Sequence, residues 1–368
     1  MRFNVFAITL FTALNVFAQY PDSIRLNDVR FLASHNSYKK KPDPKVLKFL
    51  KRFKKQLSGE MDPIQLDYGH ELLSVQMDQY GVRGFELDVN YDPKGGQFKK
   101  RRVNAFIPGL KQRSKDSLLA KPGYKLLHIA DVDYESNYTT FVQALTEIRE
   151  WSLSNRAHTP LFINIEIKKA NPGDYSKALR FLGFKKAIKV DSLALVLLDT
   201  EIRDVFNGTD CLYTPTNFRQ GSETIKQQLE ANGWPALNAS LGKIFFILDG
   251  DVNGIYLRSL DRGDDRPMFL YGDPEAPSTA FVIQNDPIGR EREIAQLSVR
   301  YMVRTRSDAG TLEIRSNDKS RWESALRSNA QIISTDYYRP DYSLGNLFVQ
   351  FNAEMFDKVT GLVLRSNR

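Results

Sequence analysis

Short apolar runs alternate with longer amphipathic segments along the chain after Pro21. Five of these runs have the length and apolar content of buried strands: Val29–Ser34, Val82–Val89, Lys125–Ile129, Leu161–Ile167 and Ile244–Leu248. The segments between them place apolar residues at helical spacing. They predict a helix that begins at Asp43-Pro44, another that ends near Tyr80-Gly81, and helices over Thr139–Leu153 and most of residues 175–206.

The C-terminal half continues this alternation with shorter and less regular runs. Strands are expected at Met268–Tyr271 or Phe281–Ile283, at Tyr301–Thr305 and at Gln331–Ser334, with helices over Ser320–Arg327 and Leu347–Leu364. Strands that alternate with helices predict an α/β protein with a parallel sheet. Because seven or eight strands are expected, a TIM-type (β/α)-barrel, which can be distorted or incomplete, is favoured over an open sheet.

Polar residues fall at the expected carboxyl ends of the strands, where barrel enzymes have their active sites. In chain order they are His35, Asn36, Glu86, Asp88, His128, Glu166, Lys168, Arg304 and Arg306. Glu86/Asp88, Glu166/Lys168 and Arg304/Arg306 are each spaced by two, so the members of a pair share one face of a strand. Unpaired buried charge is costly, so a purely structural core would not select them. We expect them to converge at one mouth of the barrel.

The residue types in this set favour phosphodiester chemistry on a metal. Asn36, Glu86, Asp88 and Glu166 supply oxygen atoms, which hard cations such as Ca²⁺ prefer. Such a metal neutralises phosphate charge, and a histidine can protonate a leaving oxygen. Each residue alone is weak evidence, because a histidine at a strand end is more often structural than catalytic.

The first 18 residues have the pattern of a signal peptide. Arg2 is followed by an apolar run over Phe3–Phe17, and Val16-Phe17-Ala18 has the small residues of a cleavage site after Ala18. The run is too short to span a bilayer comfortably. We therefore expect a secreted or periplasmic protein in which residues 19–368 form a single catalytic domain.

Composition indicates a globular fold without disulfides and an anionic partner. The content is 42% hydrophobic and 26% charged, as in a globular protein. Cys211 is the only cysteine, which excludes an internal disulfide and, with four histidines, disfavours a structural zinc site. The formal charge of +8, one unit less without Arg2, favours an anionic partner such as nucleic acid or an anionic membrane.

Several of these segments resemble a known family. The strings ASHNSY at Ala33–Tyr38 and GVRGFELD at Gly81–Asp88 resemble the first- and second-strand signatures of phosphatidylinositol-specific phospholipases C. The string LFINIEIK at Leu161–Lys168 is similar to the strand that carries a further metal-binding glutamate. Arg304–Ala309 and Ile333–Asp336 resemble the closing strands of the bacterial and fungal calcium-dependent members. The resemblance runs from about residue 28 to residue 340.

The resemblance implies a reaction and a role for each site residue. The reaction is cleavage of the glycerol–phosphate bond of phosphoinositides, which yields diacylglycerol and a cyclic inositol phosphate that water can open. His35 and His128 match the catalytic histidines, Asn36, Glu86, Asp88 and Glu166 match the Ca²⁺ ligands, and Lys168 and Arg304 match phosphate-contacting cations. Arg306, on the same strand face as Arg304, is a further candidate for substrate binding. The base stays open between His35 and Glu86.

His128 is the least secure of these matches. Its distance along the chain from Asp88 is longer than in the animal enzymes. His70 and His158 are the only other candidates, and neither follows an expected strand.

Three other functions compete with this interpretation. A glycerophosphodiester phosphodiesterase typically has Arg-Gly after its first histidine, where this chain has Asn36-Ser37. A non-catalytic lipid-binding barrel would usually have lost a histidine or a metal ligand, and this chain keeps all of them. A nuclease is disfavoured, because no aromatic residues interleave a basic stripe at the expected mouth.

A phosphoinositide substrate requires peripheral docking on an anionic membrane, and no protein partner is implied. Two basic segments suit this docking: the helix with Lys45, Lys48, Lys51, Arg52, Lys54 and Lys55, and the insertion with Lys99, Lys100, Arg101, Arg102, Lys111, Arg113 and Lys115. We expect the apolar stripe of the helix to pack on the barrel. Phe106, Ile107 and Leu110 of the insertion fit no core period and are expected to be exposed.

Overall fold

The computed structural model describes residues 20–55, 57, 61–349, 351 and 362–364. The predicted signal peptide and most of the predicted closing helix lie outside these residues. Within them, no helix has both the length and the apolar character needed to cross a bilayer.

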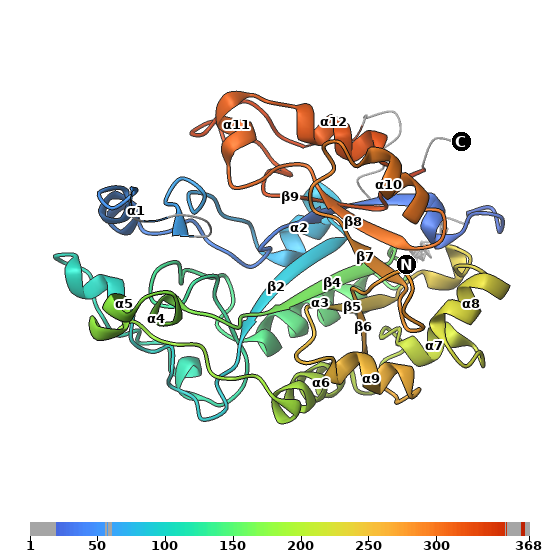
Figure 1. Ribbon diagram of the computed structural model, residues 1–368, viewed down its shortest axis with the longest axis horizontal. Coiled ribbons are helices and arrows are strands. Elements are labelled where there is room, and N and C mark those ends of the chain that lie inside the picture. The colour runs from blue at the N-terminus through green and yellow to red at the C-terminus, as the bar shows by residue number, and fades with distance from the viewer. Residues whose placement is uncertain (1–19, 56, 58–60, 350, 352–361, 365–368) are drawn as a thin grey trace, which may run out of the picture.

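Eight parallel strands form a nearly closed barrel (Figure 1). Their order around the barrel is β6-β5-β4-β2-β1-β9-β8-β7. The strands are β1 (Val29–Ser34), β2 (Gly84–Asn90), β4 (Leu161–Ile167), β5 (Ile244–Asp249), β6 (Met268–Leu270), β7 (Phe281–Ile283), β8 (Met302–Arg306) and β9 (Ile332–Thr335). A parallel bridge between Tyr271 and Phe281 links β6 to β7. The predicted TIM-type barrel is confirmed, and both alternatives for the sixth strand are strands.

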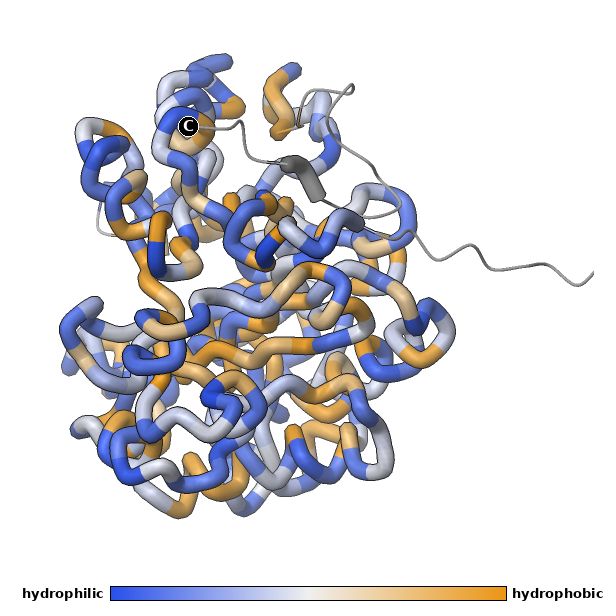
Figure 2. Tube along the Cα trace, turned by 90° about the vertical axis from the view of Figure 1, so that its right-hand side faces the viewer, coloured by the Kyte–Doolittle hydropathy of each residue, from blue (hydrophilic) through white to orange (hydrophobic). Residues whose placement is uncertain are grey.

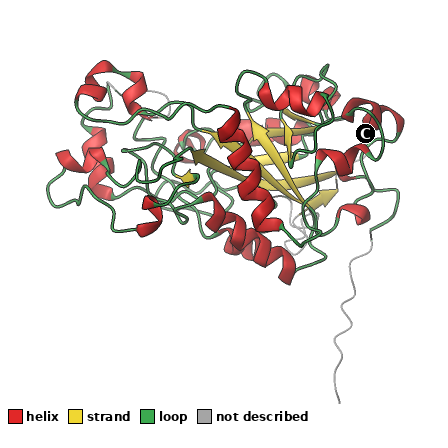
Figure 3. Cartoon of the chain, turned by 90° about the horizontal axis from the view of Figure 1, so that it is seen from below, coloured by secondary structure: helices red, strands yellow, loops and turns green. Residues whose placement is uncertain are grey.

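Helices surround the strands, most of them on the outside of the barrel and some beside its mouth (Figure 1 and Figure 3). They are α1 (Pro44–Lys51), α2 (Leu73–Tyr80), α3 (Phe141–Ser154), α4 (Pro172–Tyr175), α5 (Lys177–Phe181), α6 (Ser192–Phe206), α7 (Pro215–Arg219), α8 (Ile225–Ala231), α9 (Ile255–Asp261), α10 (Glu291–Leu297), α11 (Leu312–Ser316) and α12 (Ser320–Arg327). Local signals fix their ends: the Asp43 side chain caps α1, and Gly81 ends α2 in the left-handed conformation.

The barrel interior changes from aromatic to charged toward the carboxyl ends of the strands. Phe162 on β4 contacts Phe31 and Phe245, with ring centroids 4.9 and 5.3 Å apart. The same face of β4 continues as Asn164 and Glu166, because side chains alternate along a strand. Hydrophobic residues accordingly follow the strands through the middle of the molecule, with hydrophilic segments outside (Figure 2). The aromatic layer supports a charged layer at the mouth.

Two expectations about secondary structure are wrong, one about a strand and one about a helix. The expected third barrel strand, Lys125–Ile129, contains only the two-residue strand β3 (Lys125–Leu126), which runs antiparallel to β2. The chain after β2 turns back at the barrel mouth without the crossover that a parallel strand needs. The expected closing helix is also incorrect where it is described, because Leu362–Leu364 forms β10, antiparallel to β1. It fills the ladder beside Val29–Phe31, since β2 pairs only with Ala33 and Ser34.

Residues 44–53, 99–115 and 177–184 form a satellite lobe beside the barrel mouth, which includes α1 and α5 on the left of Figure 1. The apolar stripe of α1 packs in this lobe, against Val103 and Ile107, and not on the barrel as expected. Ile107 is buried and Leu110 is partly buried in the same cluster, so their expected exposure is wrong. Phe106 is exposed, as expected.

Candidate active site

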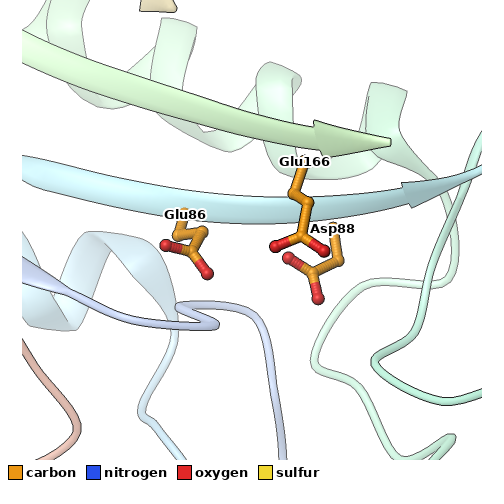
Figure 4. A group of neighbouring side chains, drawn as sticks. All are labelled: Glu86, Asp88 and Glu166. Atoms are coloured by element: carbon orange, nitrogen blue, oxygen red, sulfur yellow. The ribbon is translucent and has the colours of Figure 1, made fainter. Parts of the chain in front are cut away.

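Strand register brings the predicted carboxylates together. Glu86 lies opposite Asn164, and Asp88 lies opposite Glu166, in the parallel pairing of β2 with β4. Ligand oxygens of Glu86, Asp88 and Glu166 lie within 4.8 Å of one another (Figure 4). Glu86 and Asp88 are buried, whereas Glu166 is about a third exposed. This grouping is the one that the period-two spacing predicted.

Lys168 lies among these carboxylates. Its Nζ is 2.8 Å from Asp88 Oδ2 and 2.8 Å from Glu166 Oε1. Burial raises the pKa of Asp88 well above its ordinary value; Lys168 opposes this shift, and the charges of Glu166 and Glu86 add to it. Carboxylates that repel one another are stabilised by a cation between them. In this structure the Lys168 ammonium is that cation.

The Asn36 amide completes an oxygen set that fits Ca²⁺. One of its terminal atoms lies 3.0 and 3.2 Å from the carboxylate oxygens of Asp88, and the other lies 2.8 Å from Tyr68 Oη. The nitrogen is the atom that faces Asp88, because there it donates to both carboxylate oxygens while the amide oxygen accepts from Tyr68 Oη. Since the Tyr68 hydroxyl can also accept from the nitrogen, the amide can turn its oxygen toward a bound cation. With the oxygen toward Asp88, four side chains offer the oxygen ligands that Ca²⁺ prefers.

Glu86 is held as a carboxylate beneath the mouth. Arg304 Nη2 donates a hydrogen bond to Glu86 Oε2, and Asn164 Nδ2 donates to the same oxygen at 3.1 Å. Burial raises the pKa of Glu86, but Arg304, followed by His35, outweighs burial and holds the pKa at about 2. Arg304 is almost fully buried and also donates to Asn285.

His35 is oriented by a buried carboxylate. Its Nδ1 lies 2.7 Å from Asp336 Oδ1, while its Nε2 lies 3.2 Å from Arg306 Nη1 and 3.3 Å from Glu86 Oε1. Burial, followed by the charge of Arg306, lowers the pKa of His35 to about 3. The imidazole is therefore neutral at pH 7, and an Nδ1–H donated to Asp336 leaves Nε2 as a proton acceptor.

His128 has the same kind of support. Its Nδ1 lies 2.8 Å from Asp133 Oδ2, and Asp133 is fully buried. Although β3 differs from the expected strand, it leads His128 into the same cavity as His35. That cavity has a volume of about 140 Å³, and its lining also includes Glu166, Lys168 and Arg306.

The predicted site residues thus separate into two levels. His35, Asn36, His128, Glu166, Lys168 and Arg306 line the cavity, whereas Glu86 and Arg304 line a small space in the barrel interior beneath it. The two other histidines lie elsewhere: His70 Nε2 donates to the carbonyl of His35, and His158 contacts Ser152.

Sequence reasoning missed the groups that orient the site. Asp133 and Asp336 hold the two histidines, and Tyr68 contacts both His35 and Asn36. Asp336 ends one of the closing segments, so its position at the end of β9 was a usable signal. Asp133 follows His128 by five residues in a loop, where no periodicity marks its direction.

Comparison with known proteins agrees with this geometry. The sequence profile of a family described as "Phosphoinositide phospholipase C, Ca2+-dependent" matches residues 24–360. No curated protein matches the chain.

The solved structures that resemble the fold include two bacterial enzymes. One is a calcium-dependent phosphoinositol-specific phospholipase C from the Gram-negative bacterium Pseudomonas sp, with 14% identity and a TM-score of 0.50 over 86% of this chain and 91% of that one. The other is a Ca²⁺-dependent phosphatidylinositol-specific phospholipase C from Streptomyces antibioticus, with 14% identity and a TM-score of 0.50 over 94% of this chain and 100% of that one. Because the family profile spans most of the chain, the protein belongs to the Ca²⁺-dependent phosphoinositide phospholipase C family.

Proposed function

We propose that the chain cleaves phosphoinositides with His35 as general base and His128 as general acid. The observation that carries this assignment is that both imidazoles bind a buried carboxylate through Nδ1, at 2.7 and 2.8 Å, and line one cavity. A carboxylate on Nδ1 fixes the tautomer and leaves Nε2 for the substrate. Glu86 is the weaker candidate for the base, because Arg304 and Asn164 already bind its carboxylate.

Asn36, Glu86, Asp88 and Glu166 would hold Ca²⁺, which when bound neutralises phosphate charge and acidifies the attacking hydroxyl. Lys168 and Arg306 reach the cavity as cations and contact the phosphate. Arg304 belongs to the site through Glu86. These assignments give each charged residue predicted for the site a role in binding the metal, in binding the substrate or, for Arg304, in holding Glu86.

The reaction transfers two protons. His35 Nε2 accepts the proton of the inositol 2-hydroxyl as that oxygen bonds to phosphorus. The bond from phosphorus to the glycerol oxygen breaks, and His128 Nε2 donates a proton to the departing diacylglycerol. The product is a cyclic inositol phosphate, and water opens it when the two histidines exchange roles.

Two substrates with different leaving groups separate the two histidines. Diacylglycerol leaves only when it is protonated, whereas p-nitrophenol leaves as a stable anion. His128→Ala should lower kcat about 10²–10⁴-fold on short-chain phosphatidylinositol and far less on p-nitrophenyl inositol phosphate. His35→Ala should lower both. If His128→Ala lowers kcat equally on the two substrates, His128 is not the acid.

We also propose that the satellite lobe docks the enzyme on an anionic bilayer. Phe181 is 93% exposed at the end of α5, and Phe53, Phe106 and Leu182 are exposed in the same lobe. The lobe carries the lysine and arginine residues of α1 and of residues 99–115, and each such charge near an anionic leaflet contributes about 1 kcal/mol. Exposed apolar side chains surrounded by cations fit a membrane interface.

Vesicle binding tests this docking surface. Phe181→Ser should weaken binding to phosphatidylinositol-containing vesicles but not cleavage of the short-chain substrate. Replacing Lys99, Lys100, Arg101 and Arg102 with Gln should weaken vesicle binding and flatten its salt dependence. Leu193→Ser is the matched control, since Leu193 is 70% exposed on α6. An equal effect of the control, or equal loss on both substrates, would contradict the proposal.

A further inference from the structure

Lys39 is a charged residue within the protein interior that the reaction above does not use. Its side chain is fully buried, four residues after His35. Nζ donates to the carbonyl oxygens of Leu66 and Tyr68, both at 2.8 Å, and lies 3.3 Å from Asp133 Oδ2. Burial lowers the pKa of Lys39, and Asp133 acts in the opposite direction. These three oxygens, with the carbonyl of Lys40 at a longer 3.4 Å, satisfy the three N–H donors of the ammonium.

The contacts of Lys39 connect three loops that carry site residues. The first loop contains His35 and Asn36, the second contains Tyr68, and the third contains His128 and Asp133. Asp133 Oδ2 is shared, because it lies 2.8 Å from His128 Nδ1 as well as 3.3 Å from Lys39 Nζ. Lys39 also lies over the ring of Tyr68, with Nζ 4.4 Å from the ring centroid.

The charge of Lys39 has a consequence for His128. Burial of a carboxylate is costly without a partner of opposite charge, and Lys39 is that partner for Asp133, with both side chains fully buried. Asp133 in turn binds His128 Nδ1 at 2.8 Å and fixes the orientation of the imidazole, so that Nε2 is the nitrogen left for the substrate.

We propose that Lys39 is a positioning residue for His128 and acts through Asp133 to hold that imidazole in the orientation from which Nε2 serves the leaving group. The proposal rests on the acid role assigned to His128 above. Lys39 touches neither substrate nor cavity, so its effect must pass through the shared carboxylate oxygen. Its removal should therefore resemble the loss of an acid, not the loss of a binding group.

The leaving-group comparison distinguishes this role from a structural one. Lys39→Met should lower kcat about 10²-fold on short-chain phosphatidylinositol, with a much smaller loss on p-nitrophenyl inositol phosphate. The Ca²⁺ concentration for half-maximal activity should not change. Equal losses on the two substrates, or recovery of the full rate at high Ca²⁺, would overturn the proposal, because either result would place the role of Lys39 in the fold or in the Asn36 loop.

Lys125→Met is the matched control. Lys125 is also fully buried, donates to the carbonyl oxygens of Lys121 and Gly123 at 2.8 and 2.9 Å, and lies 4.0 Å from Asp92 Oδ2. It has no link to His128 through a shared carboxylate in the described structure. Lys125→Met should leave the ratio of the two rates at the wild-type value, and a shift as large as that of Lys39→Met would overturn the proposal.

The double variant Lys39→Met/Asp133→Asn covers the case in which Lys39→Met does not fold. It leaves no uncompensated carboxylate, and its loss should equal that of Asp133→Asn alone, since both changes act on one interaction. Additive losses would overturn the proposal. If His128→Ala shows no leaving-group dependence, the acid assignment fails as well. If His128→Ala shows leaving-group dependence and the Lys39 variants do not, only the role of Lys39 fails.

Discussion

Replacing Arg304 with Met tests whether this arginine serves Glu86 or the substrate phosphate. Arg304 donates to Glu86 in the barrel interior, and both side chains are only 4% exposed. Together with His35, it holds the pKa of Glu86 at about 2 instead of the ordinary 4.5. At about 1.4 kcal/mol per pKa unit, this difference is about 3 kcal/mol of stability at neutral pH. Removal of one partner of a buried pair costs about 3–5 kcal/mol.

The pH dependence has a definite sign. In the wild-type protein the Glu86 contribution is fully present above pH 4.5 and is lost as the pH falls toward 2, because the folded pKa is depressed. Without Arg304, burial raises the Glu86 pKa, so the variant loses stability as the pH rises. The difference in free energy of unfolding should therefore already be large at pH 4, because Glu86 is still charged in the wild-type protein there, and should grow to about 3–5 kcal/mol at pH 7.

Urea unfolding in excess chelator at pH 4 to 8 measures this difference. Arg203→Met is the control, because Arg203 pairs with Asp265 at the surface, where the two side chains are 41% and 63% exposed, and should contribute about 1 kcal/mol or less. The double variant Arg304→Met/Glu86→Gln should recover most of the lost stability. If Arg304→Met is as stable as the wild type at pH 7 and only raises KM, then Arg304 binds phosphate and our account is wrong.

Three further outcomes are expected. Lys168→Gln should raise Ca²⁺ affinity in calorimetric titration while kcat falls, because it removes an ammonium from among the ligands; lower affinity would show that Lys168 organises the carboxylates. Asp336→Asn should lower kcat about 10²–10⁴-fold at unchanged Ca²⁺ affinity, and a normal kcat would exclude the orienting role of Asp336. Mass spectrometry of the exported chain should find Gln19 at its N-terminus, and an intact Met1 would refute the signal peptide.

The barrel was predictable because two independent sequence signals identify its strands. Apolar runs such as Leu161–Ile167 locate them, and pairs such as Glu86/Asp88 reveal which face turns inward. The register of β2 with β4 then brings Asp88 beside Glu166, as the shared direction of the strands requires. The carboxylate cluster therefore follows from spacing together with parallel order.

The rest depends on contacts that periodicity does not encode. Ile107 packs in one cluster with α1 because the segment after β1 and the segment after β2 meet at the barrel mouth. The apolar pattern of one segment carries no information about its contact with the other. β10 is three residues long and owes its place to an unpaired stretch of β1. Asp133 orients His128 from a loop, where the direction of a side chain is set by tertiary contacts.

The position of His128 does not depend on the number of residues between β2 and β3, because β3 pairs antiparallel with β2. Leu126 pairs with Val89, one residue beyond Asp88, so the ladder between β2 and β3 sets where the chain re-enters the mouth. Residues between the two strands can be added to the satellite lobe without moving that pairing, and loop closure cost grows only slowly with length. The long interval after Asp88 is therefore no argument against His128, since its place depends on two paired residues and on Asp133, not on the number of residues between the strands.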